Sequence, residues 1–249
     1  MVALLLVSGL TAAGCDRVPL DEMNEIYYHW DHKQVVCAAN LDTRSGNDLD
    51  SIFAGLERAR DRGEIIGLYT HNPGYTVPWD KLEAVVAKAA ELKLDFITYP
   101  QLDGELPQRG GILLSFDDSA IESWYMARPM FDRYGAKVTF FVTRYDLWNE
   151  VERAELHDLA ADGHAIEAHG KRHVRGPAYV TENGLGSYMS NEVLPSIELL
   201  RADGFTPTVF AYPFGMRTGE TDREILKYVK RVRSVSFSVE GAVGDPCPE

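Results

Sequence analysis

Basic residues, cysteines and long apolar runs are all scarce in this sequence of 249 residues. Its 25 Lys and Arg residues stand against 38 Asp and Glu residues, which gives a net charge of -13 at pH 7. Because contact with phosphate backbones requires a basic face, this deficit argues against nucleic acid as a partner. No repeat, low-complexity tract or long linker divides the chain. With 45% hydrophobic residues, the chain is able to bury a full core, and its length suits a single α/β barrel.

An apolar run lies at the N-terminus and is too short to span a bilayer. "MVALLLVSGLTAAGC" is an apolar stretch followed by small residues and Cys15, which is typical of an export signal. "TAAGC" resembles the lipobox of bacterial lipoproteins, although no Lys or Arg precedes the apolar run as a signal normally requires. We predict a lipoprotein-type signal peptide over residues 1–15, lipidation of Cys15, and an N-terminal tether over residues 16–32. An ordinary apolar N-terminus with a chance cysteine is the alternative.

The chain has three cysteines, so lipidation of Cys15 would leave Cys37 and Cys247. An oxidising compartment permits a disulfide between these two. Cys37 lies in an apolar, strand-like run, where a buried free thiol is equally compatible with the pattern. Both possibilities stay open at this point.

Strand-like and helix-like stretches alternate over residues 33–249, which we predict to form one domain. The expected strands are continuous hydrophobic runs, as is typical of parallel strands covered on both faces. Several of the helical stretches between them end on Gly, the usual helix stop. Eight strands with helical crossovers predict an α/β fold, namely a closed or nearly closed (β/α) barrel, with an open doubly wound sheet as the alternative. The strands are expected at 34–40, 64–70, 94–99, 111–116, 137–143, 164–168, 208–212 and 233–239.

The motifs "SFDD", "YTH", "HGKRH" and "YPFG" each follow one of these strands. Because the C-terminal ends of parallel strands meet at one face, the polar side chains of these motifs should converge. Taken singly, the histidine pair is as typical of a solvated loop, the aspartates of a helix N-cap, and "YPFG" of a turn. Their coincidence at four strand ends favours a metal site. The side chains expected to meet are Asp117, Asp118, His71, His169 and His173.

This set of residue types has a definite chemistry. Two imidazoles and one carboxylate bind a divalent cation such as zinc and leave a position open for water. The bound water becomes acidic enough to attack a carbonyl near neutral pH. A second carboxylate can take its proton, and a separate histidine can protonate the leaving group, which matters most for an amine. The five residues therefore suffice for metal-assisted hydrolysis of an acyl group.

The motifs "LLSFDD", "KVTFFV", "GHAIEAHGKRH" and "FAYPFG", in this order over residues 111–215, resemble those of the polysaccharide deacetylases, the NodB-like carbohydrate esterases. That family also has a late Leu-x-x-His motif, whose counterpart here, Leu68 to His71, precedes the others. The order therefore resembles the circularly permuted one of poly-N-acetylglucosamine deacetylases, with residues 33–103 corresponding to the family's C-terminal end. The resemblance implies a distorted or incomplete (β/α) barrel.

The permutation has a consequence for the two ends of the domain. It implies that the strands at 34–40 and 233–239 are neighbours, which brings Cys37 and Cys247 near one another and favours the disulfide.

The resemblance also implies a role for each motif residue. The ion would be zinc in first place, with cobalt or nickel as alternatives. The general base would be Asp117 and the general acid His71. The metal ligands would be Asp118, His169 and His173. Substrate and oxyanion contacts would come from Leu68 at the acetyl-methyl pocket, and from the "YPFG" residues Tyr212 and Phe214, the latter through its backbone N–H.

Three departures from the family pattern stand out. Ala211 occupies the place of an Arg that usually orients the base, and Gly170 replaces a hydroxyl residue after the first metal histidine. The Asp-x-x-x-Trp motif that steadies the acid is not recognisable, although Asp42 lies in the right region. Arg217 and Arg172 are the candidates to replace the missing Arg.

The resemblance implies an exported, metal-dependent N-deacetylase of a polysaccharide, anchored in the bacterial cell envelope at the periplasmic face or the cell surface. An O-acetyl esterase of the acetyl-xylan type is the nearest alternative, because an ester needs less help from the acid. A catalytically impaired glycan-binding module is a second alternative, favoured by the missing Arg and Trp motifs and opposed by the five retained residues. A purely structural lipoprotein leaves the clustering unexplained. The polymer, the membrane leaflet and the oligomeric state are not indicated.

Overall fold

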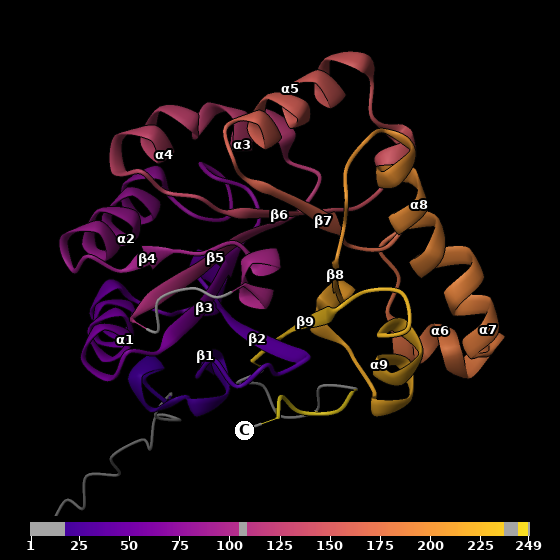
Figure 1. Cartoon of the computed structure of the whole chain (residues 1–249), viewed down its shortest axis with the longest axis horizontal. Coiled ribbons are helices and arrows are strands. Elements are labelled where there is room, and N and C mark those ends of the chain that lie inside the picture. Colours follow the sequence, from indigo (N-terminus) through magenta and orange to yellow (C-terminus); the bar gives the residue numbers. More distant parts are fainter. Residues whose placement is uncertain (1–17, 105–108, 237–243, 249) are drawn as a thin grey trace, which may run out of the picture.

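The computed structural model describes residues 18–104, 109–236 and 244–248, in which a parallel β-barrel is surrounded by helices (Figure 1). The barrel strands follow one another around the ring as β3, β2, β9, β8, β7, β6 and β5, and β3 pairs with β5 to close it. This confirms the (β/α) barrel and excludes the open sheet. The bounds are β2 Val35–Asn40, β3 Ile65–Thr70, β5 Gly111–Asp118, β6 Thr139–Val142, β7 Ala165–Ala168, β8 Val209–Ala211 and β9 Arg231–Val235.

Two short strands flank the ring. β1 (Tyr27–Tyr28) pairs antiparallel with β3, and β4 (Asp95–Phe96) pairs parallel with β5. The strand expected at 94–99 is reduced to β4, because Thr98 and Gln101 form a capping box that starts the 3₁₀ helix Tyr99–Asp103. β4 therefore lies outside the closed ring.

The helices follow the predicted alternation with one break. The stretch 120–135, expected to be one helix, divides at Ala127, since Pro129 has no N–H to donate to a continuous helix. The helices that lie close to their predicted places are α1 Leu49–Arg62, α2 Trp79–Glu91, α3 Ile121–Met126, α4 Arg128–Tyr134, α5 Glu150–Ala161, α8 Leu194–Ala202 and α9 Gly219–Ile225.

Residues 171–190, expected to be a long loop, are mostly helical. They contain α6 (Gly176–Asn183), α7 (Leu185–Tyr188) and the start of a π-helical turn over Met189–Val193 that leads into α8. Pro177 sits in the first turn of α6, where its missing N–H removes no helical hydrogen bond. These elements form the right-hand edge of the molecule in Figure 1.

The segment expected to tether the domain is in large part folded. Leu20, Ile26, Tyr27 and Tyr28 are almost fully buried. The Tyr27 hydroxyl donates to the Leu20 carbonyl at 3.1 Å, and the Arg58 guanidinium lies 3.7 Å from the centre of its ring. Leu20 and residues 26–28 therefore pack as part of the folded domain. The predicted signal peptide and Cys15 lie outside the described residues.

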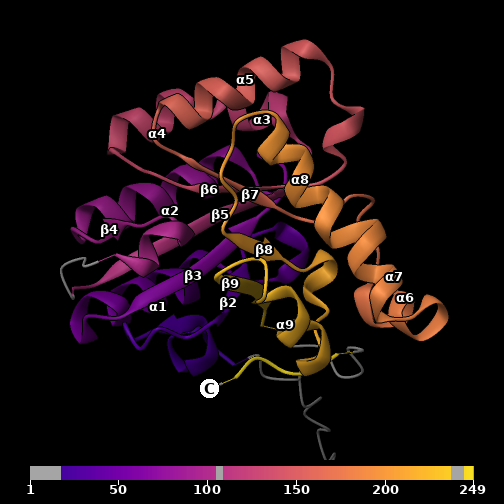
Figure 2. The same ribbon diagram turned by 45° about the vertical axis from the view of Figure 1, so that its right-hand side comes forward.

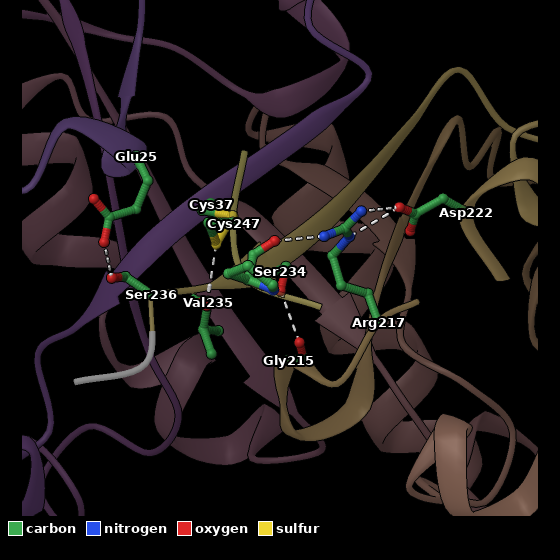
Figure 3. Close-up of a disulfide and its surroundings, with 10 residues drawn as sticks. Glu25, Cys37, Gly215, Arg217, Asp222, Ser234, Val235, Ser236 and Cys247 are labelled. Carbon is green, nitrogen blue, oxygen red and sulfur yellow. Dashed lines mark hydrogen bonds and ion pairs between the residues drawn. A yellow bond between two sulfur atoms is a disulfide. The ribbon is translucent and has the colours of Figure 1, made fainter. Parts of the chain in front are cut away.

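The two ends of the domain meet at one seam of the barrel. β2 pairs with β9, with Cys37 opposite Ser234, which confirms that these strands are neighbours. Cys37 also forms a disulfide with Cys247 (Figure 3), as the permuted order implied. In Figure 1 the indigo β2 lies beside the yellow β9. Such proximity of the ends is what a circular permutation requires.

The pleat of β5 separates two environments. Ile112, Leu114 and Phe116 belong to the large core between the barrel and the helices. Figure 2 shows from a second side how the helices surround the barrel strands. The alternate residues, from Leu113 to Asp117, face the barrel interior, because successive side chains of a strand point to opposite faces. Within the described parts of the chain, no helix has the length and apolar character needed to cross a membrane.

Candidate active site

A cavity of about 930 Å³ opens at the C-terminal ends of β2, β3 and β5. Its walls are the loops that follow these three strands, and they include Asp42, His71, Asp117 and Asp118. His169 and His173, which follow β7, approach the same place through Asp118. The structure thus brings together all five side chains that the strand-end motifs predicted to meet.

Asp118, His169 and His173 form the one group of three potential metal ligands found among the described residues. One ligand atom from each lies within 4.8 Å of the others. Asp118 Oδ1 is 3.0 Å from His173 Nε2 and 3.5 Å from His169 Nε2. His169 Nδ1 lies 2.9 Å from the Ala211 carbonyl, which only accepts, so this nitrogen carries the proton and Nε2 keeps its lone pair.

Two further observations fit a cation between these groups. Asp118 Oδ1 is buried and has no hydrogen-bond partner among the described residues, an arrangement that is costly without a ligand. Burial would raise the pKa of Asp118, but the neighbouring His169 and His173 hold it well below its usual value, so the carboxyl is ionised. Two imidazoles and a carboxylate are a donor set that zinc prefers.

Three residues at this face adopt left-handed backbone conformations without being glycine. They are Asp118 (φ 86°), His173 (φ 63°) and Phe214 (φ 60°). Such conformations cost about 1–3 kcal/mol each and persist where the surroundings impose them, commonly at functional sites. The backbone is therefore strained at two of the candidate ligands and at the loop that faces them.

The loop that carries the histidines is held from outside. Gly170 (φ 77°) replaces the family's hydroxyl residue, and a Cβ there would lie 3.2 Å from Pro213. Thr143 Oγ1 instead donates to the Gly170 carbonyl at 2.7 Å. Glu192, which is 1% exposed, accepts the Arg172 backbone N–H at 2.9 Å through its side chain, and its carbonyl accepts the N–H of residue 171 at 3.0 Å. Thr143 and Glu192 thus hold the loop that carries the two histidines.

Asp42 orients His71 on the opposite wall of the cavity. His71 Nδ1 lies 2.5 Å from Asp42 Oδ2. Asp42 Oδ1 accepts hydrogen bonds from Thr70 at 2.6 Å and Thr76 at 2.8 Å, which fixes the carboxylate. Trp124 Nε1 donates to the His71 carbonyl at 2.7 Å. Asp42 therefore contacts His71 where the resemblance placed the steadying Asp only by region.

The electrostatics of His71 suit a proton donor. Burial alone would lower its pKa, but the hydrogen bond to Asp42 and the negative charges of Asp117, Asp42 and Asp118 together raise it to about 9. An imidazole with this pKa is protonated at neutral pH and can give its Nε2 proton to a leaving group.

The guanidinium that contacts Asp117 comes from β9. Arg233 Nη2 donates to Asp117 Oδ2, and both side chains are almost fully buried in the barrel. The guanidinium also lies between the rings of Tyr69 and Phe141, at 5.1 Å and 4.8 Å from their centres. Asp117 Oδ1 has no hydrogen-bond partner among the described residues. This oxygen is available to accept a proton.

Neither of the two candidates that the sequence offered, Arg217 and Arg172, takes this position. Arg217 donates to Asp222 and to the Pro246 carbonyl (Figure 3), while Arg172 pairs with Glu192. Arg233 was missed because residues 233–239 read as an ordinary strand. The signal that could have identified it is two arginines two positions apart at the start of this strand, which points both toward the barrel interior.

Two residues expected to touch substrate lie elsewhere. Leu68 is fully buried in the core between barrel and helices and does not line the cavity. Tyr212 is also buried, and its hydroxyl donates to Asp222 Oδ1 at 2.8 Å, so its side chain points toward α9. The Phe214 ring is half-exposed and lies 4.5 Å from the His173 ring, centre to centre. Of the three, Phe214 alone lies at the site.

The family model for polysaccharide deacetylases matches residues 105–232, slightly more than half of the chain. The chain belongs to the polysaccharide deacetylase family. The matched segment of this deacetylase includes β5 but neither β2 nor β3, which carry Asp42 and His71 and close the barrel between β9 and β5. Its elements are therefore in circularly permuted order.

Several solved deacetylase structures are similar to this chain, and the first of them shares its fold. The deacetylase PplD of Streptococcus pyogenes, in complex with acetate, is 20% identical with a TM-score of 0.52, covering 66% of this chain and 78% of PplD. The BpsB deacetylase domain from Bordetella bronchiseptica is 15% identical with a TM-score of 0.49, covering 85% and 96%. IcaB from Ammonifex degensii is 16% identical with a TM-score of 0.45, covering 86% and 91%. No curated protein matches the chain.

Proposed function

We propose that this deacetylase removes acetyl groups from an N-acetylated polysaccharide with the help of a divalent cation. Asp118, His169 and His173 would hold the ion, zinc in first place and cobalt or nickel as alternatives. The observation that carries this proposal is the approach of three ligand atoms to within 4.8 Å beside an unpartnered Asp117 oxygen. When bound, such an ion lowers the pKa of water and polarises the acetyl carbonyl.

The residues around the ion divide the proton transfers between them. Asp117 Oδ1 takes a proton from the attacking water, while Arg233 keeps the other oxygen in place. His71 gives a proton to the leaving nitrogen, since Asp42 occupies its Nδ1 and leaves Nε2 for substrate. The backbone N–H of Phe214 is our candidate to stabilise the oxyanion. Water and an N-acetyl group thus become acetate and an amine.

The raised pKa of His71 favours an amide over an ester as the bond that is cleaved. An amine must be protonated to leave, whereas an alcohol leaves more readily, so a dedicated acid is of greatest use in N-deacetylation. The pairs of Asp42 with His71 and of Arg233 with Asp117 also argue against a catalytically impaired glycan-binding module. Asp42 supplies a carboxylate for the proposed acid, and Arg233 supplies the guanidinium that the third motif lacks.

We further propose that the protein is exported and anchored in the bacterial cell envelope through a lipid on Cys15. The apolar N-terminal run supports this. So does the Cys37–Cys247 disulfide, because disulfides persist in oxidising compartments. Since Leu20, five positions after Cys15, is already buried in the folded domain, the anchor would hold the domain close to the membrane surface. Cys15→Ala should move the protein from the membrane fraction to the soluble one; an unchanged distribution would refute the anchor.

The enzyme is tested on the chain lacking residues 1–15. It is stripped with a chelator, reloaded with zinc, cobalt or nickel, and incubated with N-acetylglucosamine hexamer or acetylated xylan. We expect acetate from the hexamer only after reloading, no ion uptake in Asp118→Ala, and normal uptake without turnover in His71→Ala. Full amidase activity in His71→Ala would contradict the acid assignment. Acetate from xylan alone would establish the esterase, and binding without acetate from either substrate would establish the binding module.

A further inference from the structure

We propose that the glycan is acidic, and that Arg44 and Arg175 bind carboxylate or phosphodiester groups on the sugars next to the N-acetylated one. The inference rests on the proposed function, because it names the substrate class of the same site. Arg44 follows β2 and Arg175 follows β7. These strands lie across the barrel from each other, separated by β9 and β8 on one side and by β3, β5 and β6 on the other. The two guanidinium groups therefore stand on opposite sides of the mouth.

Arg44 lies in the short 3₁₀ helix Thr43–Ser45 and lines the cavity together with His71 and Asp118. Its side chain is exposed, and within the described part of the chain it forms no ion pair. Each carboxylate that lines the same cavity lies beside another basic side chain. Asp42 binds His71, Asp117 binds Arg233, and the two histidines surround Asp118. The positive charge of Arg44 is thus left for a ligand.

Arg175 is held beside the metal site by a stacking contact. Its guanidinium lies 4.2 Å from the centre of the Phe214 ring, and that ring lies 4.5 Å from the His173 ring. No carboxylate within the described ranges pairs with Arg175. Stacking uses the face of the guanidinium and leaves the N–H groups at its edge to bind an anion. Phe214 thereby positions a second unpaired cation at the mouth.

The negative net charge of the molecule makes two unpaired arginines at the cavity significant for the choice of ligand. With a net charge of -13, the protein repels anionic polymers at long range, so an acidic substrate requires local cations at the cleft. Many other arginines are committed to carboxylates, as Arg58 is to Glu64 and Arg128 to Asp162. A guanidinium matches the geometry of carboxylates and phosphates with two parallel hydrogen bonds. A neutral glycan could accept hydrogen bonds from Arg44 and Arg175 but would leave their charges unbalanced.

The test measures binding by calorimetry on chelator-treated protein, so that no turnover occurs. The probes are the neutral N-acetylglucosamine hexamer, a hexamer alternating N-acetylglucosamine with glucuronic acid, and an oligomer of N-acetylglucosamine 1-phosphate. We expect at least one acidic probe to bind roughly fivefold more tightly than the neutral one, and the preference to shrink at high salt. The acidic probe that binds more tightly identifies carboxylate or phosphodiester as the group recognised.

Variants assign the preference to the two residues. Arg44→Gln and Arg175→Gln should each reduce the ratio of acidic to neutral affinity, and together they should abolish it. Arg62→Gln is the matched control, because Arg62 is also exposed and unpaired in the described ranges but ends α1 at the other end of the barrel. It should leave the ratio unchanged.

Equal affinity for all three probes, or an undiminished preference in the double variant, would overturn the acidic subsite. Acetate release from the neutral hexamer by the reloaded enzyme would still support the proposed function in that case. Conversely, arginine-dependent binding of an acidic probe without acetate release from any probe would refute the proposed function and leave the subsite standing.

Discussion

Replacing Arg233 with Met tests how much the buried ion pair between Arg233 and Asp117 contributes to the stability of the domain. The Arg233 side chain is 0% exposed and that of Asp117 is 3% exposed, so water cannot replace the lost partner. Removing one partner of a buried ion pair costs about 3–5 kcal/mol, because the other charge stays buried without compensation. We expect Arg233→Met to lower the free energy of unfolding by about this amount, measured by urea denaturation with tryptophan fluorescence.

The double variant Asp117→Asn/Arg233→Met tests whether the loss of stability comes from the unpaired charge of Asp117. Nε and Nη1 of Arg233 have no partner among the described residues, so the pair is incompletely satisfied to begin with. Removing both charges should therefore recover much of the loss, since a buried pair adds little net stability over uncharged groups. The double variant should be more stable than Arg233→Met alone. Additive losses from the two single variants would refute the reasoning.

Arg231→Met is the matched control on the same strand. Arg231 pairs with Asp103, whose side chain is 26% exposed and can be rehydrated after the change. We expect a loss of about 1 kcal/mol, within the range of solvent-accessible pairs. A loss as large as that of Arg233→Met would show that the effect comes from the strand position and not from the burial of the carboxylate.

Three further outcomes follow from buried groups. Glu192→Ala should weaken zinc binding roughly 10–100-fold in a chelator competition, as loss of outer-shell support does, while the exposed Glu198→Ala should not. Burial lowers the pKa of His164 to about 4. As the pH falls, this histidine is therefore protonated near pH 6.5 in the unfolded chain but only near pH 4 in the folded one. Unfolding free energy should thus fall by roughly 3 kcal/mol between these values, a slope that His164→Gln should remove in denaturation curves; equal slopes would contradict the assignment. Replacing both Cys37 and Cys247 by Ser should lower the melting temperature through a loss of about 2–5 kcal/mol, and an unchanged midpoint would show that the bond is absent in solution.

The parts of the fold that sequence could predict are those with strong local signals. Continuous apolar runs mark the barrel strands, and each polar motif follows one of them directly, so its position at the C-terminal face needs no tertiary information. Asp117, Asp118 and His169 are placed in this way. The pairing of β2 with β9 is different, because it follows from the order of motifs compared with the family and not from any local pattern.

The parts that could not be predicted depend on contacts between distant segments. Nothing local to Arg233 shows that its partner is Asp117, 116 positions away. The helices α6 and α7 are polar and interrupted by Gly184, so their sequence is typical of a loop until Tyr188 is seen to be buried. In residues 20–28 acidic and amide residues interrupt the apolar ones, so no continuous apolar run indicates a strand, and β1 forms because β3 offers an edge.

The pairing of β2 with β9 holds the proposed acid and the proposed base in place relative to each other in the permuted chain. Arg233, which contacts the proposed base Asp117, belongs to β9, whereas the proposed acid His71 and its partner Asp42 follow β3 and β2. In an unpermuted order the connection between such strands would run through the chain itself. Here it consists of strand pairing and the Cys37–Cys247 disulfide, which ties β2 to the segment after β9. A movement of β2 relative to β9 would displace the proposed acid from the proposed base. The Cys37–Cys247 disulfide therefore provides a covalent connection at the place where the permuted chain has no peptide connection.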